Sequence, residues 1–141
     1  MRLTRFTDNA LRCLLYLGAR PERTATVGEV ALRMHMSEDH LTKVVQRLAQ
    51  RGYVQTIRGR KGGVRLAKAP EEIIVGRVVR DTEEDCALVP CFSDGAACPI
   101  SAACNLAPLL DDALEAFFAA LNRTTLRDLM SKREHLLQLV S

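Results

Sequence analysis

The sequence predicts a mainly α-helical fold with one small β-hairpin, and two observations indicate this class. Leu and Ala dominate a chain of 141 residues in which 48% are apolar and only 4% are aromatic, and both residue types favour helices. One segment, residues 53–66, instead gathers β-forming residues around a Gly-rich turn, as a hairpin does. At this length the chain forms one domain, or one small domain with an accessory element.

The first predicted helix covers residues 3–19. Thr4 can cap its start, and Gly18 ends it. Its broad apolar face, which we expect to be buried, is formed by Leu11, Leu14, Leu15 and Leu17. Asp8 and Arg12 are four residues apart and therefore share one face of this helix, where they can form a surface ion pair.

Two further helices are predicted at residues 26–34 and 37–52, joined by a tight connection. Thr26 and Glu29 make a capping box for the first, and Ser37 caps the second. The second helix has an apolar face formed by Leu41, Val44, Val45 and Leu48. Its opposite face is polar and basic and carries His40, Lys43, Arg47 and Arg51. Two short helices of this kind predict a helix-turn-helix motif.

The hairpin at residues 53–66 follows this motif directly, in the position of the wing in winged helix-turn-helix proteins. From Lys43 to Lys68 the chain has eight cations and no acid. A recognition helix followed by a basic wing indicates binding to duplex DNA, with contacts both to base edges and to phosphates. The residues that we expect to contact DNA are Ser37, His40 and Lys43 in the helix and Arg58, Arg60 and Lys61 in the wing.

The C-terminal half begins with a short helix at residues 73–82 and an acidic stretch (Asp81, Glu83, Glu84 and Asp85). These acids can oppose the basic module, keep DNA away, or simply form a solvated helix end. Asn105 can cap a long helix whose apolar stripe is wider than one small domain needs, so we expect two copies to pair through it. Thr125 and Asp128 make a capping box for a short helical tail.

Four of the five cysteines fall within residues 86–104, here called the cysteine loop. Their spacing is too wide for paired CxxC motifs, and they occupy irregular chain rather than one helix face. A loop that brings three or four thiolates near one point can hold zinc or an iron–sulfur cluster. Buried or disulfide-bonded cysteines are the alternative. Cys13, which lies among leucines, is expected to be a small buried hydrophobe.

Several segments together resemble one family. They are MRLTRFTDNALR at the start, RGRKGGVRL in the wing, VGRVVRDTE after it, and three cysteines ahead of a long helix. These features, which span essentially the whole chain, are similar to the Rrf-two-type winged helix-turn-helix regulators. The opening LTRFTDNALRCLLYL and the triad Cys91, Cys98 and Cys104 most resemble the nitric-oxide-sensing repressors of that family. The resemblance implies a homodimeric repressor that releases its palindromic operator when nitric oxide reacts with a 4Fe-4S cluster.

The resemblance also implies the cluster ligands, which are Cys91, Cys98, Cys104 and, from the partner subunit, Asp8. Arg12 matches as well and is implied to couple the cluster to the DNA-binding module. Cys86 departs from the pattern and is an alternative ligand, since with the triad it offers four thiolates. Another subtype uses a His three residues beyond the third cysteine, but that position is Ala107 here.

Charge supports a division into three parts. Residues 1–68 hold 14 Lys and Arg against 5 Asp and Glu, a net charge of +9, whereas residues 69–141 hold 6 against 12, a net charge of −6. A basic half joined to an acidic half indicates a polyanion-binding module attached to a part that avoids the polyanion. We expect a winged helix-turn-helix module at 1–70, a linker helix and iron–sulfur sensor loop at 71–104, and a dimerisation helix with a helical tail at 105–141.

Other readings stay open from sequence alone. A regulator of the same family can sense iron or redox state through a 2Fe-2S cluster, and a metal-free thiol switch or a zinc-stapled regulator fits the cysteines too. An enzyme or electron carrier is not expected, because no nucleophile–base pair or Gly-rich nucleotide loop is found and the histidines are scattered. No segment approaches the roughly 18 apolar residues of a membrane span, and charges interrupt the N-terminal segment, so we expect a cytoplasmic protein.

Overall fold

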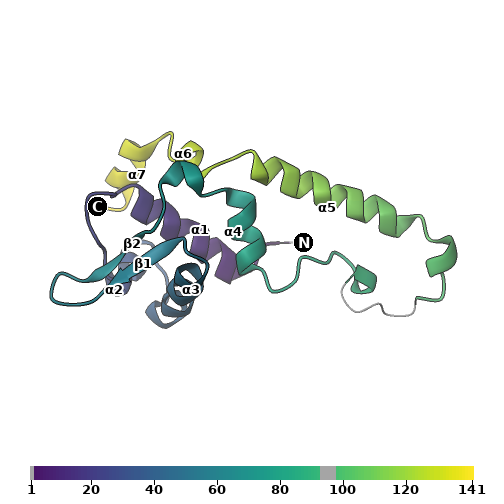
Figure 1. Ribbon diagram of the computed structural model, residues 1–141, viewed down its shortest axis with the longest axis horizontal. Helices are drawn as coiled ribbons and strands as arrows, with labels where there is room; N and C mark the ends of the chain where they lie inside the picture. Colours follow the sequence, from purple (N-terminus) through teal and green to yellow (C-terminus); the bar gives the residue numbers. More distant parts are fainter. Residues whose placement is uncertain (1, 93–97) are drawn as a thin grey trace.

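A computed structural model of the chain describes residues 2–92 and 98–141. Over these residues it is mainly helical with a two-stranded antiparallel hairpin, which confirms the predicted fold class (Figure 1). The helices are α1 Arg5–Gly18, α2 Val27–Arg33, α3 Glu38–Gln50, α4 Val75–Thr82, α5 Leu106–Asn122, α6 Leu126–Leu129 and α7 Arg133–Leu139. The strands are β1 Val54–Ile57 and β2 Gly63–Leu66, and short 3-10 turns cover Pro70–Glu72, Pro90–Phe92 and Ser101–Ala103.

The first three helices begin at the capping residues that the sequence predicts, which are Thr4, Thr26 and Ser37. Each side-chain oxygen accepts a hydrogen bond from the N–H of the third helical residue, which satisfies one of the free donors at the helix start. The capping box predicted for Thr26 and Glu29 forms only in part, because the carboxylate of Glu29 does not accept a hydrogen bond from the main-chain N–H of Thr26. The carboxylate of Glu29 instead pairs with Arg23 and accepts a hydrogen bond of 2.7 Å from the hydroxyl of Tyr16.

The core lies where α1 packs against α3, α4 and β2, with α2 packed on α3. The apolar face predicted for α3 is buried in it, with Leu41, Val44 and Leu48 fully inaccessible. Cys13 is also fully inaccessible, as expected for a small apolar side chain. Burial raises the pKa of the Cys13 thiol to about 12, so this cysteine is protonated and unreactive at neutral pH.

The hairpin pairs Val54 with Leu66 and Ile57 with Gly63. Its second strand is fastened to the loop before α2 by two main-chain hydrogen bonds between Ala25 and Val64, of 3.0 and 2.8 Å. This close approach requires glycine at position 63, because a Cβ atom there would lie 2.7 Å from the carbonyl oxygen of Ala25 and φ is +155°. The wing is therefore fixed to the body at its base, while its turn projects outward (Figure 1).

α5 extends away from the body as an arm (Figure 1). Of the α5 residues, all of which the structure describes, Phe118 alone is buried. Leu106, Leu109 and Phe117 are 57%, 64% and 38% exposed, so most of the predicted apolar stripe is uncovered within one chain. Asn105 precedes the helix but makes no side-chain capping hydrogen bond, and the expectation that it caps α5 is wrong.

The C-terminal tail returns to the body after α5. The predicted capping box forms at the start of α6, where Thr125 and Asp128 bond each other's main-chain N–H. Leu126 and Val140 are buried in the same core as α1. The guanidinium of Arg133 donates a hydrogen bond of 2.8 Å to the carbonyl of Ala19, just past the end of α1. The chain thus leaves the winged-helix body for the cysteine loop and arm and then closes back onto it.

Candidate functional site

The predicted DNA-contacting residues of α3 differ in their surroundings. Ser37 and Lys43 are exposed at the start of the helix. His40 is half-buried, because its ring packs edge-on against Phe6 of α1 with the ring centroids 5.8 Å apart. Its Nε2 atom is buried and has no hydrogen-bonding partner in the described part of the chain. His40 therefore serves as a contact between α1 and α3 and offers DNA less surface than Ser37 and Lys43.

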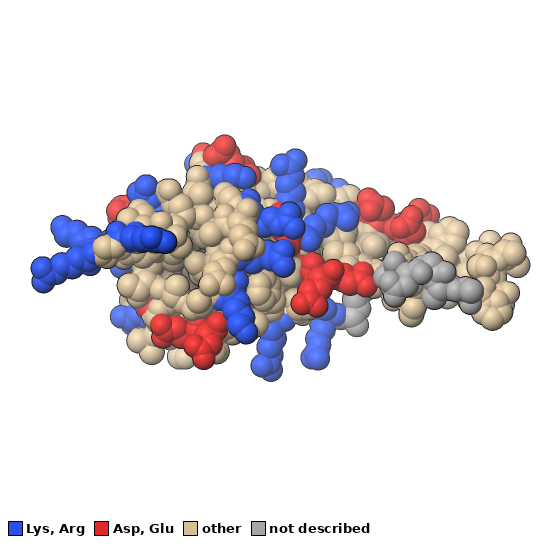
Figure 2. Space-filling model, turned by 60° about the horizontal axis from the view of Figure 1, so that its bottom comes forward, with Lys and Arg blue, Asp and Glu red and all other residues tan. Residues whose placement is uncertain are grey.

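The predicted wing contacts are Arg58, Arg60 and Lys61, and all three are exposed. Figure 2 shows basic side chains projecting from the end of the molecule where the hairpin turn lies in Figure 1. A tight turn presents them, since Gly59 has a φ of +108° and a Cβ at Gly62 would overlap the carbonyl of Ile57. Exposed cations on a fixed hairpin are suited to contacts with phosphates.

Asp8 lies in an open hollow between α1 and the start of α3, which Ser37 and His40 also line. Its side chain is 59% exposed, and its Oδ2 lies 3.6 Å from Nη1 of Arg12. Nη2 of Arg12 in turn donates a hydrogen bond of 2.5 Å to the carbonyl oxygen of Met34, at the end of α2. One guanidinium thus connects an accessible carboxylate to the turn between α2 and α3.

Two further residues of this hollow, Arg5 and Asn9, are not among those predicted from the sequence. Their spacing could have identified them, because they are four residues apart, as Asp8 and Arg12 are, and so project from a shared side of α1. They add a second cation and an amide beside Asp8. The hollow is therefore more polar than the predicted pair alone.

The five cysteines, all within the described residues, are free thiols. In the cysteine loop Cys91 is exposed, and Cys86, Cys98 and Cys104 are half-buried. Residues 93–97, which separate Cys91 from Cys98, lie outside the described residues. In residues 2–92 and 98–141, no three His, Cys, Asp or Glu side chains converge into a metal-binding group. One chain therefore does not bring the predicted ligands together over the part that is described.

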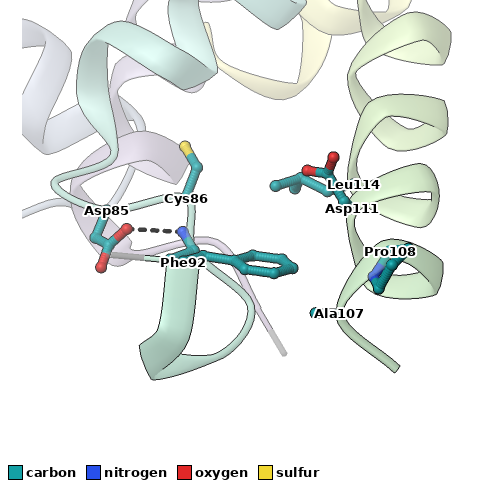
Figure 3. Close-up of a pocket in the computed structure, with 8 residues that line it drawn as sticks. Asp85, Cys86, Phe92, Ala107, Pro108, Asp111 and Leu114 are labelled. Carbon is teal, nitrogen blue, oxygen red and sulfur yellow. Dashed lines mark hydrogen bonds between the residues drawn. The ribbon is translucent and has the colours of Figure 1, made fainter. Parts of the chain in front are cut away.

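Cys86 lines a hollow between the cysteine loop and α5 (Figure 3). Phe92 points from the loop toward α5, where Ala107, Pro108 and Leu114 form the opposite wall. The side-chain oxygen of Asp85 accepts a hydrogen bond of 2.7 Å from the N–H of Ala87, which shapes the start of the loop. Desolvation by partial burial raises the pKa of the Cys86 thiol, while Arg80 opposes this and Glu83 and Asp85 reinforce it. Without a bound metal, Cys86 is therefore a neutral thiol at neutral pH.

The donor types fit an iron–sulfur cluster even though one chain does not gather them. Cys91, Cys98 and Cys104 are free and at least partly accessible, and thiolates are the usual ligands of such clusters. Asp8 is an accessible carboxylate on a different element, α1, beside the recognition helix. Among the described residues of one chain, Asp8 does not converge with these cysteines into a metal-binding group.

The structure places no described helix that is both long and apolar enough to pass through a lipid bilayer.

Related proteins were identified by sequence. Over 99% of its length the chain is 47% identical to the HTH-type transcriptional regulator NsrR of Geobacillus kaustophilus and covers 97% of that protein. It is 45% identical to the regulator of the same name from Bacillus subtilis, again over 99% of this chain and 97% of the relative. These relatives are named transcriptional regulators, which confirms the prediction that the chain is not an enzyme.

Solved structures share the fold. T. potens IscR superposes with a TM-score of 0.77 at 20% identity, covering 96% of this chain and 90% of that one. CymR, the global cysteine regulator of B. subtilis, gives a TM-score of 0.74 at 26% identity, covering 94% and 98%.

Residues 3–132 match the Rrf2 family, described as iron-dependent transcriptional regulators. Together with relatives 47% and 45% identical over nearly the whole length, this match shows that the chain belongs to the Rrf2 family of transcriptional regulators.

Proposed function

We propose that the protein is a homodimeric repressor that binds palindromic operator DNA, carries an iron–sulfur cluster and lowers its operator affinity in response to nitric oxide. Membership of the Rrf2 family and the shared name of its relatives support regulation of transcription. Within the chain we assign DNA binding to residues 1–70, sensing to residues 71–104 and dimerisation to residues 105–141.

The observation that carries this proposal is the position of Arg12. It touches the carboxylate of Asp8 at 3.6 Å and the carbonyl of Met34 at 2.5 Å. Met34 immediately precedes the turn that leads into α3. A change at Asp8 therefore alters the charge that faces Arg12, and Arg12 holds this turn through Met34. This turn sets the position of Ser37 and Lys43.

DNA binding follows from the exposed cations of the recognition helix and wing. Ser37 and Lys43 lie at the start of α3, and the wing adds Arg58, Arg60 and Lys61. In a symmetric dimer two such modules reach consecutive half-sites if the recognition helices lie roughly 34–36 Å apart, one turn of DNA. A palindromic operator matches that symmetry.

The dimer is supported by α5. Its exposed leucines and Phe117 leave an apolar stripe that a second copy of the same helix can cover. Burying an apolar side chain of this size contributes about 1.5–3 kcal/mol, so several such contacts stabilise a dimer.

The residues that would hold the cluster are Cys91, Cys98 and Cys104, with Asp8 of the partner subunit. We favour a 4Fe-4S cluster, with 2Fe-2S as the alternative. When bound, it would supply iron that reacts with small diatomic ligands, most readily at a position held by a carboxylate, a harder and weaker ligand than thiolate. Cys86 stays an alternative ligand, since it is also a free, half-buried thiol of the same loop.

The test uses anaerobically purified full-length protein and an operator duplex selected from a random pool. Operator affinity is measured with and without nitric oxide, alongside iron content, for the wild type and Asp8→Ala. We expect the wild type to lose affinity with nitric oxide and Asp8→Ala to lose iron or response while staying folded. An unaltered response in Asp8→Ala would exclude the cross-subunit ligand.

The same experiment separates the competing functions. A protein that responds to iron depletion but not to nitric oxide would be an iron or redox sensor of the same family. Colourless protein without bound iron that responds to oxidants would be a thiol switch. Zinc in place of iron would indicate a zinc-stapled regulator.

A further inference from the structure

We propose that residues 80–83, here called the α4 junction, transmit the state of the cysteine loop to the wing, the recognition helix and α1. This inference rests on the proposed function and adds the path by which the loop reaches the DNA-binding elements of its own subunit. The α4 junction comprises Arg80, Asp81, Thr82 and Glu83, and it ends three residues before Cys86. Each of these four consecutive side chains contacts a different partner.

Asp81 joins α4 to the DNA-binding elements. Its Oδ2 accepts a hydrogen bond of 2.6 Å from the hydroxyl of Tyr53, which is 5% exposed and directly precedes β1. Its Oδ1 lies 3.5 Å from the guanidinium of Arg51, the residue that caps the C-terminus of α3. Burial and this carboxylate both raise the pKa of Tyr53, so the phenol stays a donor at any physiological pH. One carboxylate thus holds the point where the recognition helix ends and the wing begins.

Glu83 and Thr82 join the same segment to the start of α1. Oε1 of Glu83 accepts hydrogen bonds from the main-chain N–H and the hydroxyl of Thr4, of 2.9 and 3.0 Å. The hydroxyls of Thr82 and Thr7 lie 3.0 Å apart, and both residues are buried. Thr7 immediately precedes Asp8, so these contacts fix the part of α1 that presents the carboxylate.

Arg80 joins the α4 junction to the arm. Its guanidinium lies 3.6 Å from the ring centroid of Phe118 and 3.3 Å from a carboxylate oxygen of Glu115. Phe118 is the buried residue of α5. The cysteine loop therefore leaves the body at the α4 junction and rejoins it through α5, which packs on α4 itself. The α4 junction thus contacts both the segment that enters the loop and the helix that follows the loop.

This arrangement predicts how a change in the loop spreads. A displacement of residues beyond Cys86 acts on Glu83 and Asp81, because they are the nearest residues of the entering segment whose side chains are bonded to other elements. Asp81 passes the shift to Arg51 and Tyr53, and Glu83 passes it to the helix that carries Asp8. Hydrogen bonds to charged groups are stronger than those between neutral groups, so the loss of one should be measurable.

The chain offers two matched pairs of variants for the test. Tyr53→Phe removes the hydroxyl that binds Asp81, and Tyr16→Phe removes an equivalent buried hydroxyl, 2.7 Å from Glu29, that does not involve the α4 junction. Glu83→Ala removes the acceptor for Thr4. Glu84→Ala alters the exposed neighbouring acid, for which the described residues provide no hydrogen-bonding partner.

For each protein the ratio of operator dissociation constants with and without nitric oxide is measured, together with iron content and urea unfolding. We expect Tyr53→Phe, which loses one hydrogen bond to a carboxylate, and Glu83→Ala, which loses two, each to lower this ratio by about tenfold or more. Iron content should not change. Tyr16→Phe and Glu84→Ala should keep the wild-type ratio, although Tyr16→Phe should lose as much stability as Tyr53→Phe.

The outcomes separate the two proposals. If the wild-type ratio is one, the proposed function fails, whatever the variants do. If the wild type responds and the α4 junction variants respond equally, the transmission path is wrong and the proposed function stands. If Tyr16→Phe loses the response as fully as Tyr53→Phe, general destabilisation explains both and the path is again overturned.

Discussion

Arg12 donates a hydrogen bond of 2.5 Å from Nη2 to the main-chain oxygen of Met34. Met34 follows the last residue of α2, and the next residue, His35, has a φ of +53°, in the left-handed region that non-glycine residues rarely occupy. A side chain of α1 thus stabilises a sharp turn in the helix-turn-helix motif. Because Arg12 also faces Asp8, the same guanidinium connects this turn to the carboxylate.

Replacing Arg12 with Ala should weaken operator binding. The variant lacks the hydrogen bond to Met34, which should lower the free energy of unfolding by about 1–2 kcal/mol and loosen the start of α3. Operator affinity is measured in the absence of nitric oxide, and stability by urea unfolding. Arg33→Ala is the control, since Arg33 is an exposed α2 residue without a hydrogen bond or ion pair among the described residues. Equal operator affinity for the two variants would contradict the role of Arg12.

Local features of the fold can be predicted because they depend on neighbouring residues. Thr4 and Ser37 cap helices through hydrogen bonds that span three residues, and the Gly-rich wing turn is equally local. The same kind of spacing favours a hydrogen bond from the main-chain N–H of Thr26 to the carboxylate of Glu29, but Arg23 and Tyr16 occupy that carboxylate instead. Local spacing identifies the available partners and does not decide between them.

The α4 junction could not be predicted, because its contacts join distant parts of the chain. Tyr53 and Asp81 are 28 residues apart, and Thr4 and Glu83 are 79 apart. In the sequence, the acidic stretch at residues 81–85 is equally consistent with a solvated helix end, and Glu84 is indeed exposed to solvent. The cluster ligands present the same difficulty, since the proposed set takes its carboxylate from a second chain and no pattern within one chain specifies that pairing.

The wing cations should contribute sequence-independent affinity. Arg60→Ala and Lys61→Ala each remove an exposed cation from the hairpin turn and should weaken binding to operator and unrelated duplexes alike. The slope of log affinity against log salt should fall by about 0.9 for each phosphate that the variant no longer neutralises. The exposed Lys132, before α7, provides the control. If Arg60→Ala leaves both affinity and salt dependence unchanged, the wing does not contact phosphates.

The apolar stripe of α5 should mediate dimerisation. Leu109 is 64% exposed on the arm, so Leu109→Asp places a charge in the proposed interface without disturbing the core. Native mass spectrometry should show a dimer for the wild type and mostly single chains for the variant. Leu139→Asp changes a comparably exposed leucine on α7, at 72%, and should remain dimeric. A dimer that persists in Leu109→Asp would place the interface elsewhere.

The cysteines should separate into two groups. Cys91→Ser, Cys98→Ser and Cys104→Ser should each lose most bound iron and visible absorption, because a serine hydroxyl is a poor substitute for a thiolate ligand. Cys86→Ser should retain both, because the proposed set of three cysteines and Asp8 is complete without Cys86. Cys13→Ala controls for the loss of a thiol in the core. Loss of iron in Cys86→Ser, with retention in Asp8→Ala, would instead indicate an all-cysteine site.

The pH dependence of stability should reveal the Glu29 cluster. The hydrogen bond from Arg23 holds the pKa of Glu29 below its ordinary value, and the bond from Tyr16 acts in the same direction, while partial burial opposes them. A carboxyl group whose pKa is lower in the folded state contributes stability above its unfolded pKa of about 4.3, and this contribution is lost as pH falls through the folded pKa. Urea unfolding midpoints should therefore fall on acidification below about pH 4.3 more steeply in the wild type than in Glu29→Gln, which cannot ionise. Parallel curves for the two proteins would mean that Glu29 has the same pKa in the folded and unfolded chain.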